Sequence, residues 1–397
     1  MNTAREIRIC MDIGSSQHQV AIGLSNGDLL EEFTVSHTPT DIEQFFNKIE
    51  DYHDRFQCPI ALAMEAYNGY ARPIDRMALQ KGYRVLNVNN HKLAQFKKIF
   101  PGAAKTDAID TKKMFELFTL SDHLPLAKGV LQPILVLPEA NEKLKRLTRR
   151  RQLLVEEKVR IVNRLQGDLQ AISPGLASIT GSVDNRWFLH FLVAREAIEK
   201  LATLRLNSLL KIKGIGKCYA AAIVAWQETA TFSTETTWVG AMVICDAKRI
   251  LELLDEIKAL ENAMKELTPD SEIASRLKTI LGFGEVTSAT LAGELGTVAR
   301  FTSEASLALY LGMAILDNSS GNYQGTKQSQ HVNKRAKTAM ITAVARHIDH
   351  SSQAKMYYDK KRSEGKKHNQ AVRALGRHLV RVIWSMLTKH RDYQVRD

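Results

Sequence analysis

The chain has 397 residues, 44% of them hydrophobic and 25% charged, with a formal net charge of +12. This composition is typical of a soluble globular protein of two or three domains. No apolar run approaches the roughly 18 residues that cross a bilayer, so we expect no membrane segment and a cytoplasmic location. The four cysteines are scattered without a Cys-x-x-Cys pair, which argues against a zinc site or a disulfide framework.

The positive charge is concentrated at one end of the chain. Residues 318–397 contain 17 Lys and Arg against 5 Asp and Glu, whereas the remainder holds 38 of each kind. A neutral body with a basic C-terminal fifth indicates a polyanionic partner there. A well-solvated terminal helix would produce the same charge, so charge alone leaves both interpretations open.

Short apolar segments predict an α/β domain at the N-terminus. Three strands joined by tight turns come first, and strands then alternate with helices. The expected elements are strands at 6–13, 18–24 and 29–35, a helix from Thr40, a strand at 59–64, a helix at 73–81 and a strand at 83–88. Three antiparallel strands followed by this alternation is the order of the RNase H-like fold.

The middle of the chain is predicted to be helical. Residues 139–172 form one long helical pattern, and a heptad pattern over 250–267 places Ile250, Ile257 and Met264 on one seam. We expect a coiled-coil arm, folded back on itself or paired with another protomer in a dimer or tetramer. The Pro269-Asp270 pair then opens a mostly helical C-terminal domain. The predicted domains are therefore 1–137, 138–268 and 269–397.

Two glycine turns precede predicted helices. Gly282-Phe283-Gly284 and, in the insert, Gly214-Ile215-Gly216 resemble the turn of a helix-hairpin-helix element. The backbone N–H groups of such a turn can hold a DNA phosphate. Each turn taken alone is equally explained as an ordinary tight connection.

Four acidic residues are predicted to gather at one edge of the sheet. Asp12 ends the first strand and Glu65 follows the buried strand, and these strands are neighbours in an RNase H-like sheet. Asp107 and Asp110 are three apart on a helical segment, so they share one helix face. Clustered carboxylates repel one another unless a cation compensates them. Oxygen ligands of this kind select Mg²⁺ or Mn²⁺, although each acid alone could be a turn former or a helix-end charge.

These residues carry a family resemblance. Asp12, Met64-Glu65-Ala66 and Lys105-Thr106-Asp107-x-x-Asp110 resemble the DEDD motif of the insertion-sequence transposases that have a RuvC-like N-terminal domain and are related to Piv-type DNA invertases. The family's C-terminal Gly-x-Gly turn and Ser-Gly loop resemble Gly282-Phe283-Gly284 and Ser319-Ser320-Gly321. The insert at 173–245 is least accounted for, and Val332-Asn333-Lys334 departs from the family's usual Gly-Asn-Lys.

The resemblance implies a transposase that cleaves and rejoins double-stranded DNA with a magnesium or manganese site and a serine nucleophile, directed by a structured guide RNA. Ser320 is the expected nucleophile, in a polar loop at 313–333, and its neighbour Ser319 stays open as the alternative. Ser320 would have to meet the carboxylates, in the same chain or in a partner protomer. The residues expected to contact nucleic acid are Lys105, Gly282, Gly284, Lys327, Lys334, Arg335 and Lys337.

Other classes of protein share parts of this pattern. Residues 11–16 resemble the first phosphate loop of sugar kinases and actin-like ATPases, but we find no second such loop. A DEDD exonuclease would need an acid where Gly14 stands. A RuvC-like Holliday-junction nuclease, or a Piv-type invertase without a guide RNA, would share the carboxylates. A helix-hairpin-helix protein without enzymatic activity would explain the basic tail but not four converging acids.

Overall fold

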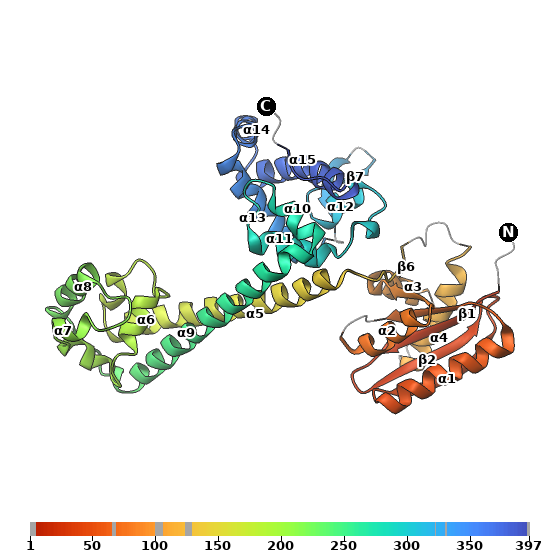
Figure 1. The fold of residues 1–397 in the computed structure, drawn as a ribbon, viewed down its shortest axis with the longest axis horizontal. Coiled ribbons are helices and arrows are strands. Elements are labelled where there is room, and N and C mark those ends of the chain that lie inside the picture. The colour runs from red at the N-terminus through yellow and green to blue at the C-terminus, as the bar shows by residue number, and fades with distance from the viewer. Residues whose placement is uncertain are drawn as a thin grey trace. The chain divides into compact units, whose positions relative to one another are not determined.

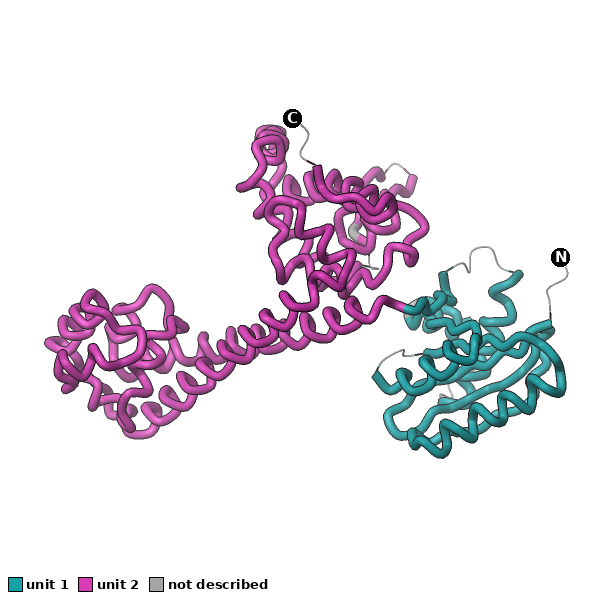
Figure 2. Tube along the Cα trace, viewed as in Figure 1, with its two compact units in different colours: residues 1–136 teal, residues 137–397 magenta. Residues whose placement is uncertain are grey.

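The computed structural model describes residues 5–65, 69–99, 106–123, 129–321, 323–329 and 332–394. The chain divides into two compact units, residues 1–136 and 137–397, which Figure 2 colours separately. Each unit has hydrophobic cores of its own. In the described parts of the chain, no helix combines the length and the apolar character that crossing a membrane requires.

The first unit is built on a sheet with strand order β3-β2-β1-β4-β5-β6. Its strands are β1 (Ile7–Ile13), β2 (Gln17–Leu24), β3 (Leu29–Ser36), β4 (Ile60–Glu65), β5 (Arg84–Val88) and β6 (Leu131–Pro133). The first three strands pair antiparallel, β4 and β5 run parallel to β1, and β6 is antiparallel to β5. This mixed arrangement is compatible with the expected RNase H-like order, with β6 added at the edge.

Helices cover both faces of this sheet (Figure 1). They are α1 (Pro39–Phe56), α2 (Arg72–Gln80), α3 (Asn90–Lys97) and α4 (Asp107–Leu120), with a 3₁₀ turn, η1 (Gly69–Ala71), before α2. Side chains of α1 and α2, such as Phe45 and Ile74, share a core with one face of β1 and β4. Side chains of α3 and α4, such as Leu93 and Phe115, share a second core with the other face. The sheet is therefore buried on both sides, which explains its continuous apolar strands.

The second unit begins with a helical arm. Helices α5 (Glu139–Ile172) and α9 (Thr236–Leu267) pack along each other (Figure 1), and Ile250, Ile257 and Met264 are buried. The buried residues of the heptad stripe therefore pack within this chain, and pairing of the arm with another protomer stays a prediction. At the far end of the arm a group of short helices, which we call the head, packs with α5 and α9 around the second hydrophobic core of this unit. Its elements are η3 (Leu176–Ile179), α6 (Arg186–Leu192), η4 (Ile198–Thr203), α7 (Leu206–Leu209) and α8 (Lys217–Gln227).

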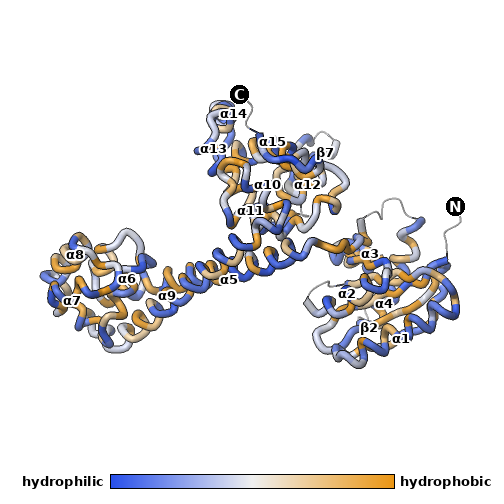
Figure 3. The backbone as a smooth tube through the Cα atoms, viewed as in Figure 1, coloured by the Kyte–Doolittle hydropathy of each residue, from blue (hydrophilic) through white to orange (hydrophobic). Residues whose placement is uncertain are grey.

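The rest of the second unit is a bundle of helices at the near end of the arm, and Leu144 and Met264 of the arm join its core. Its helices are η5 (Thr268–Asp270), α10 (Glu272–Lys278), α11 (Glu285–Leu295), η6 (Val298–Arg300), α12 (Glu304–Tyr310), α13 (Lys334–His350), α14 (Ser352–Ser363) and α15 (His368–Thr388). A two-stranded hairpin of β7 (Ile315–Ser320) and β8 (Tyr323–Gln328) precedes α13. Figure 3 shows the hydrophilic and hydrophobic stretches alternating along these helices, as expected for amphipathic helices around a core.

Candidate active site

Asp12 and Glu65 are direct neighbours across the sheet. They occupy matching positions near the carboxyl ends of the parallel strands β1 and β4, where Asp12 is in register with Glu65. The residues before them, Met11 and Met64, are fully buried, so the backbone of both acids is held by the core. The sequence-based expectation that these two strands bring their acids to one sheet edge is thus met by the strand pairing.

Asp107 and Asp110 enter from helix α4. Thr106 caps this helix, because its Oγ1 accepts a hydrogen bond from the Ile109 N–H at 3.3 Å. Both acids lie in the first turn, where the helix dipole favours negative charge. Helix α4 packs on β1 and β2, and Phe115 lies so close to Gly23 that a Cβ added there would come within 2.3 Å of its ring. This close contact fixes the position of α4 against the strand that carries Asp12.

A lysine that the sequence analysis did not single out joins two of these acids. The Nζ of Lys97, at the end of α3, lies 2.9 Å from Glu65 Oε2 and 3.1 Å from Asp110 Oδ2. All three side chains are largely buried, with exposed fractions of 17%, 18% and 13%. Lys97 therefore supplies one positive charge among four carboxylates.

The electrostatics of this cluster show a surplus of negative charge. Burial raises the pKa of Asp12 above its ordinary value, and repulsion from Glu65 and Asp107, and to a smaller extent from Asp110, raises it further, against the opposing effect of Lys97. Burial acts to lower the pKa of Lys97, but its hydrogen bonds to Glu65 and Asp110 outweigh burial and raise it. Within the described part of the chain, the ammonium of Lys97 thus does not balance the negative charge of the cluster.

A divalent cation fits this donor set in chemistry. Carboxylate oxygens are the ligands that Mg²⁺ and Mn²⁺ prefer, and the charge surplus at Asp12 is what a cation would relieve. Among the described residues, no three side chains of the His, Cys, Asp and Glu types stand close enough together to form an ion site as they are. Binding would therefore require the carboxylates around Lys97 to draw together as its ammonium moves out.

Two histidines and a tyrosine lie at the same edge of the sheet. His18, in register with Ile13 on β1, is fully buried and shares a 2.9 Å hydrogen bond between its Nε2 and His37 Nδ1. The His37 ring meets Tyr70 edge to face at 5.8 Å. Burial and the neighbouring His37 lower the pKa of His18 to about 4, so this imidazole is neutral at physiological pH.

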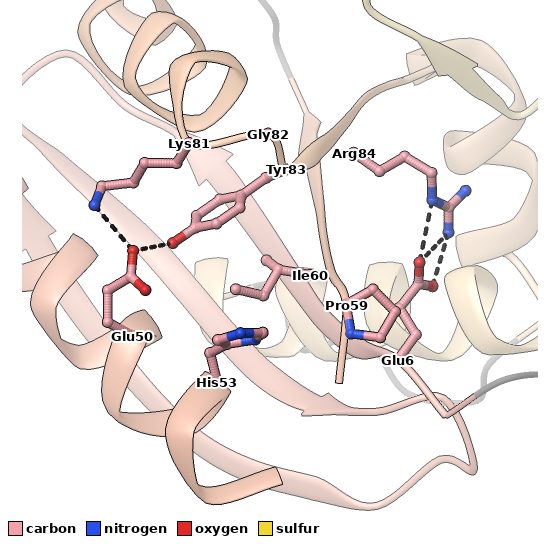
Figure 4. Close-up of a pocket in the computed structure, with 9 residues that line it drawn as sticks. All are labelled: Glu6, Glu50, His53, Pro59, Ile60, Lys81, Gly82, Tyr83 and Arg84. Carbon is pink, nitrogen blue, oxygen red and sulfur yellow. Dashed lines mark hydrogen bonds and ion pairs between the residues drawn. The ribbon is translucent and has the colours of Figure 1, made fainter. Parts of the chain in front are cut away.

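A pocket at the opposite edge of the sheet is a different feature. Figure 4 shows its lining from the amino ends of β1, β4 and β5, with Glu50 accepting hydrogen bonds from Lys81 and Tyr83 and Glu6 pairing with Arg84. The charged groups drawn there are already paired with one another. Carboxyl ends of parallel strands, rather than amino ends, form the usual ligand-binding edge of α/β sheets, so the edge with Asp12 is the candidate active site.

Ser320 lies in the second unit and ends strand β7. Its register partner on β8 is Tyr323, and Gly321 follows with a φ of 55°. Both Ser319 and Ser320 are exposed. The loop expected at 313–333 is thus largely a β-hairpin. Beyond Ile315 and Leu316 its strands are mostly polar and lack apolar alternation, so the sequence gives a weak strand signal, and cross-strand hydrogen bonds form the hairpin instead.

A buried polar network holds the start of the helix after this hairpin. Asn333 caps α13 by accepting hydrogen bonds from the N–H groups of Arg335 and Ala336. Its amide donates to Glu294 Oε2 at 2.8 Å and to Tyr310 Oη at 2.7 Å. Glu294 is 1% exposed and accepts two hydrogen bonds from Arg149, at 2.7 and 2.9 Å. These bonds lock α13 to α11 and to the arm.

The basic residues expected to contact nucleic acid divide into two groups. Lys327, Lys334 and Arg335 are exposed around the hairpin and the start of α13, and Lys337 is partly buried against Gly312. Lys105 lies outside the described residues. The Gly282-Phe283-Gly284 turn packs against α13, because a Cβ on Gly282 would come within 2.5 Å of the His347 backbone nitrogen. A phosphate-binding role for this turn remains a prediction.

Sequence reasoning missed Lys97 and Glu294. Lys97 belongs to no motif, and only its position between a buried strand and an acidic helix start hinted at a role. Glu294 had a clearer signal, since it is the one acid in the apolar stretch from Ala289 to Leu295, where burial demands a partner. That partner, Arg149, lies 145 positions away in the sequence.

Two regions of the chain match transposase families. A transposase family model of the DEDD type matches residues 9–174, and the model of the transposase IS116/IS110/IS902 family matches residues 274–359. The chain is 25% identical to an insertion element IS110 protein of 43.6 kDa from Streptomyces coelicolor, covering 81% of this chain and 80% of that protein. It is 23% identical to an insertion element IS116 protein of 44.8 kDa from Streptomyces clavuligerus, covering 97% and 95%. A transposase for insertion sequence element IS1111A from Coxiella burnetii is 26% identical over 37% of this chain and 44% of its own length.

Proposed function

The chain belongs to the DEDD-type insertion-sequence transposases, enzymes that cleave and rejoin DNA, and we propose that it does so with a divalent-metal site in the first unit and a serine nucleophile in the second. The observation that carries the proposal is the register of Asp12 with Glu65, beside a helix that begins with two more acids. We assign this unit to the RNase H-like, RuvC-like fold.

The four carboxylates, Asp12, Glu65, Asp107 and Asp110, would hold Mg²⁺ or Mn²⁺. A bound ion of this kind polarises a phosphodiester and neutralises the charge that develops on it. Asp12 and Glu65 are rigid because their strands are buried, so they would set the position of the site. Asp107 and Asp110 lie in one turn of α4, and Lys97, once released from Glu65 and Asp110, is free to pair with a DNA phosphate.

Ser320 would be the nucleophile. Its Oγ forms a bond to the phosphorus of one DNA strand while the bond from that phosphorus to a deoxyribose oxygen breaks. The hydroxyl proton passes to solvent, and the released oxygen takes up a proton from solvent. The energy of the phosphodiester is kept in the protein–DNA bond, so the reverse attack by a second DNA end rejoins the strand. The support is the exposure of Ser320 at the turn end of the β7–β8 hairpin.

We further propose three functional parts, with residues 1–137 catalytic, 138–268 a coiled-coil arm and 269–397 the serine-bearing, DNA-contacting domain. Double-stranded DNA and a structured guide RNA are the proposed nucleic-acid partners, and a dimer or tetramer the proposed assembly. The net charge of residues 318–397 supports the first of these, because a basic surface attracts phosphate.

Replacing Glu65 with glutamine tests the proposed function. Glu65→Gln keeps the shape of the side chain and removes its charge, so we expect recombination of element ends to fall roughly a thousandfold. The stabilisation of the purified protein by Mg²⁺ or Mn²⁺, measured as a shift in Tm, should disappear with it. Glu116→Gln is the matched control, since Glu116 is an exposed acid on α4. Full recombination in EDTA, or an unchanged metal-dependent Tm in Glu65→Gln, would refute the proposal.

A further inference from the structure

The helical head at the end of the arm repeats the glycine turn of the C-terminal bundle. Gly214 and Gly282 both have a φ of 86°, and Gly216 and Gly284 both adopt extended backbone before a helix. The same hydrogen bond closes each turn, from Ile215 N–H to Ile212 O at 3.1 Å and from Phe283 N–H to Ile280 O at 3.0 Å. The chain therefore contains two turns of one conformation, each leading into a helix of 11 residues.

The two turns differ in what covers them. The turn at 280–284 is enclosed by α13, and the Leu281 carbonyl accepts a 2.7 Å hydrogen bond from His347 Nδ1. In the head, a Cβ placed on Gly214 would come within 3.1 Å of the Trp187 side chain, but one placed on Gly216 would meet nothing within 4 Å, and residues 216–219 are all exposed. The backbone N–H groups at the start of α8 are therefore accessible from solvent, unlike those of the covered turn.

The charge at the two turns is also opposite. The first residue of α11 is Glu285, which pairs with Lys278 at 2.6 Å, whereas the first residue of α8 is Lys217. Lys211 and Lys213 flank the same exposed turn. Among the residues that the structure describes, no carboxylate forms an ion pair with these three lysines. Of the described side chains that flank the head turn, these three lysines are thus available to an anion.

A groove with basic walls runs beside this turn. Its first part, a hollow of about 450 Å³, has Arg195, Lys211 and Lys213 as its charged lining residues. A second hollow shares residues 193–195 with the first and adds Lys200 and Lys248, with Glu196 as its one acid. We call the two hollows together the head groove. His190 also lines the first hollow, and burial, followed by the positive charges of Lys213 and Arg186, lowers its pKa against the opposing effect of Asp255, which pairs with Arg186.

An aromatic side chain lies at the rim of the turn. Tyr219, in the first turn of α8, stacks on Trp187 with ring centroids 4.3 Å apart and is 42% exposed. Exposed aromatic rings beside basic side chains are the combination with which proteins hold nucleotides, the ring contacting a base or sugar and the cations a phosphate. The head therefore offers charge, backbone donors and an aromatic surface within one patch.

We propose that the head groove and its glycine turn form a nucleic-acid backbone site, separate from the carboxylate cluster and the serine hairpin. Arg195, Lys211, Lys213 and Lys217 would each neutralise a phosphate, and the N–H groups at the start of α8 would hold one more. The site gives the insert at 173–245 a function at the end of the arm, and its ligand is the sugar-phosphate backbone of either DNA or RNA.

The test compares two double variants of the full-length protein. Lys211→Gln with Lys213→Gln removes two charges from the groove, and Lys258→Gln with Lys265→Gln removes two exposed lysines from α9 as the matched control. Binding to a random-sequence DNA duplex and to an RNA hairpin is measured across a salt series without metal. We expect the groove variant to bind one of these about tenfold more weakly, with a salt slope lower by about two. The nucleic acid whose binding weakens, DNA or RNA, is the one whose backbone the head groove binds.

A second measurement uses the unaltered protein. Cys218 is exposed immediately after Lys217, so bound nucleic acid should slow its alkylation, read by mass spectrometry of the modified peptide. The proposal would be overturned if the groove variant and the control bound both nucleic acids equally well. Alkylation of Cys218 at the same rate with and without nucleic acid would overturn it too. Neither readout involves the carboxylates or Ser320, so failure here leaves the proposed catalytic function untouched.

Discussion

Asp12 in the first unit and Glu294 in the second are both acids held away from solvent, yet their pKa values move in opposite directions. Burial and neighbouring carboxylates raise the pKa of Asp12. Burial also acts to raise the pKa of Glu294, but hydrogen bonds from Arg149 and Asn333 outweigh it and lower the pKa. The carboxyl group of Asp12 has too little positive charge around it, whereas that of Glu294 is fully hydrogen-bonded and paired.

This difference distinguishes a binding site from a structural ion pair. Glu294 has a bidentate arginine, an amide donor and a fixed place in the packing of α11 and α13. Among the residues that the structure describes, the Asp12 cluster has four acids and the ammonium of Lys97. A site that is left with surplus charge is costly unless a further cation binds, which is the physical reason to expect a metal in the first unit and none at Glu294.

The largest effect should come from exchanging a carboxyl for an amide at each site. Asp110→Asn should lower recombination roughly a thousandfold while the protein stays folded, because it removes a metal ligand. Glu294→Gln should lower the Tm and leave recombination, assayed well below that Tm, within about threefold of the original rate. Assays of both variants for activity and thermal unfolding check this. Equal losses of activity in the two would erase the distinction.

The next largest effect should come from replacing the basic side chain that pairs with the acid at each site. Arg149→Met leaves Glu294 buried without its partner, so we expect about 3 kcal/mol of destabilisation and a Tm lower by roughly 6 to 12 °C. The control is Arg249→Met on the arm surface, whose ion pairs are exposed and worth about 1 kcal/mol or less. Denaturant unfolding measures both. A stability loss no larger than that of the control would mean that Glu294 does not depend on Arg149.

Lys97→Met should have a favourable effect in the presence of metal, in contrast to the destabilisation expected for Arg149→Met. Without the competing ammonium, we expect Mn²⁺ or Mg²⁺ to bind about tenfold more tightly, since the ion no longer has to displace a charge. The metal-free variant should be less stable than the original protein and regain that stability with metal. Calorimetric titration gives the affinity. Weaker metal binding in Lys97→Met would show that Lys97 helps to hold the ion rather than occupying its place.

The smallest effect is in the pH dependence of stability. An acid with a raised pKa favours folding while protonated, so the contribution of Asp12 is present below its ordinary value of 3.8 and is lost as the pH rises through its folded-state pKa. The contribution of Glu294, whose pKa is lowered, is present above 4.5 and is lost as the pH falls. In metal-free protein, Asp12→Asn should therefore raise the Tm by roughly 1 to 3 °C at neutral pH and by less at acidic pH. A lower Tm at neutral pH would contradict the direction of the Asp12 shift.

Local patterns in the sequence predicted much of the first unit. The strand at 59–64 follows from a continuous apolar run and the strand at 6–13 from its apolar residues before a tight turn, and the pairing of these strands brings Asp12 beside Glu65. The helix from Asp107 follows from its threonine cap and its acidic first turn. The positions of these strands and of this helix are local features that the residues themselves determine, whereas the pairing of the two strands was expected only from the RNase H-like order.

Features that depend on distant packing could not be predicted in the same way. The heptad at 250–267 shows that one face of α9 is buried but not that α5 of the same chain buries it. Two glycine turns with one conformation have different surroundings because α13, some 60 residues further along, covers only the second. Lys97 is missed for a related reason, since its two partners come from β4 and α4.

The most direct test of the central claim is to trap the protein–DNA intermediate and map it by mass spectrometry. The account predicts a nucleotide adduct on the peptide that contains Ser320. The adduct should form only with Mg²⁺ or Mn²⁺, be absent in Glu65→Gln and Ser320→Ala, and persist in Ser319→Ala. No adduct, together with an active Ser320→Ala variant, would contradict the account and favour water as the nucleophile at the carboxylate site alone.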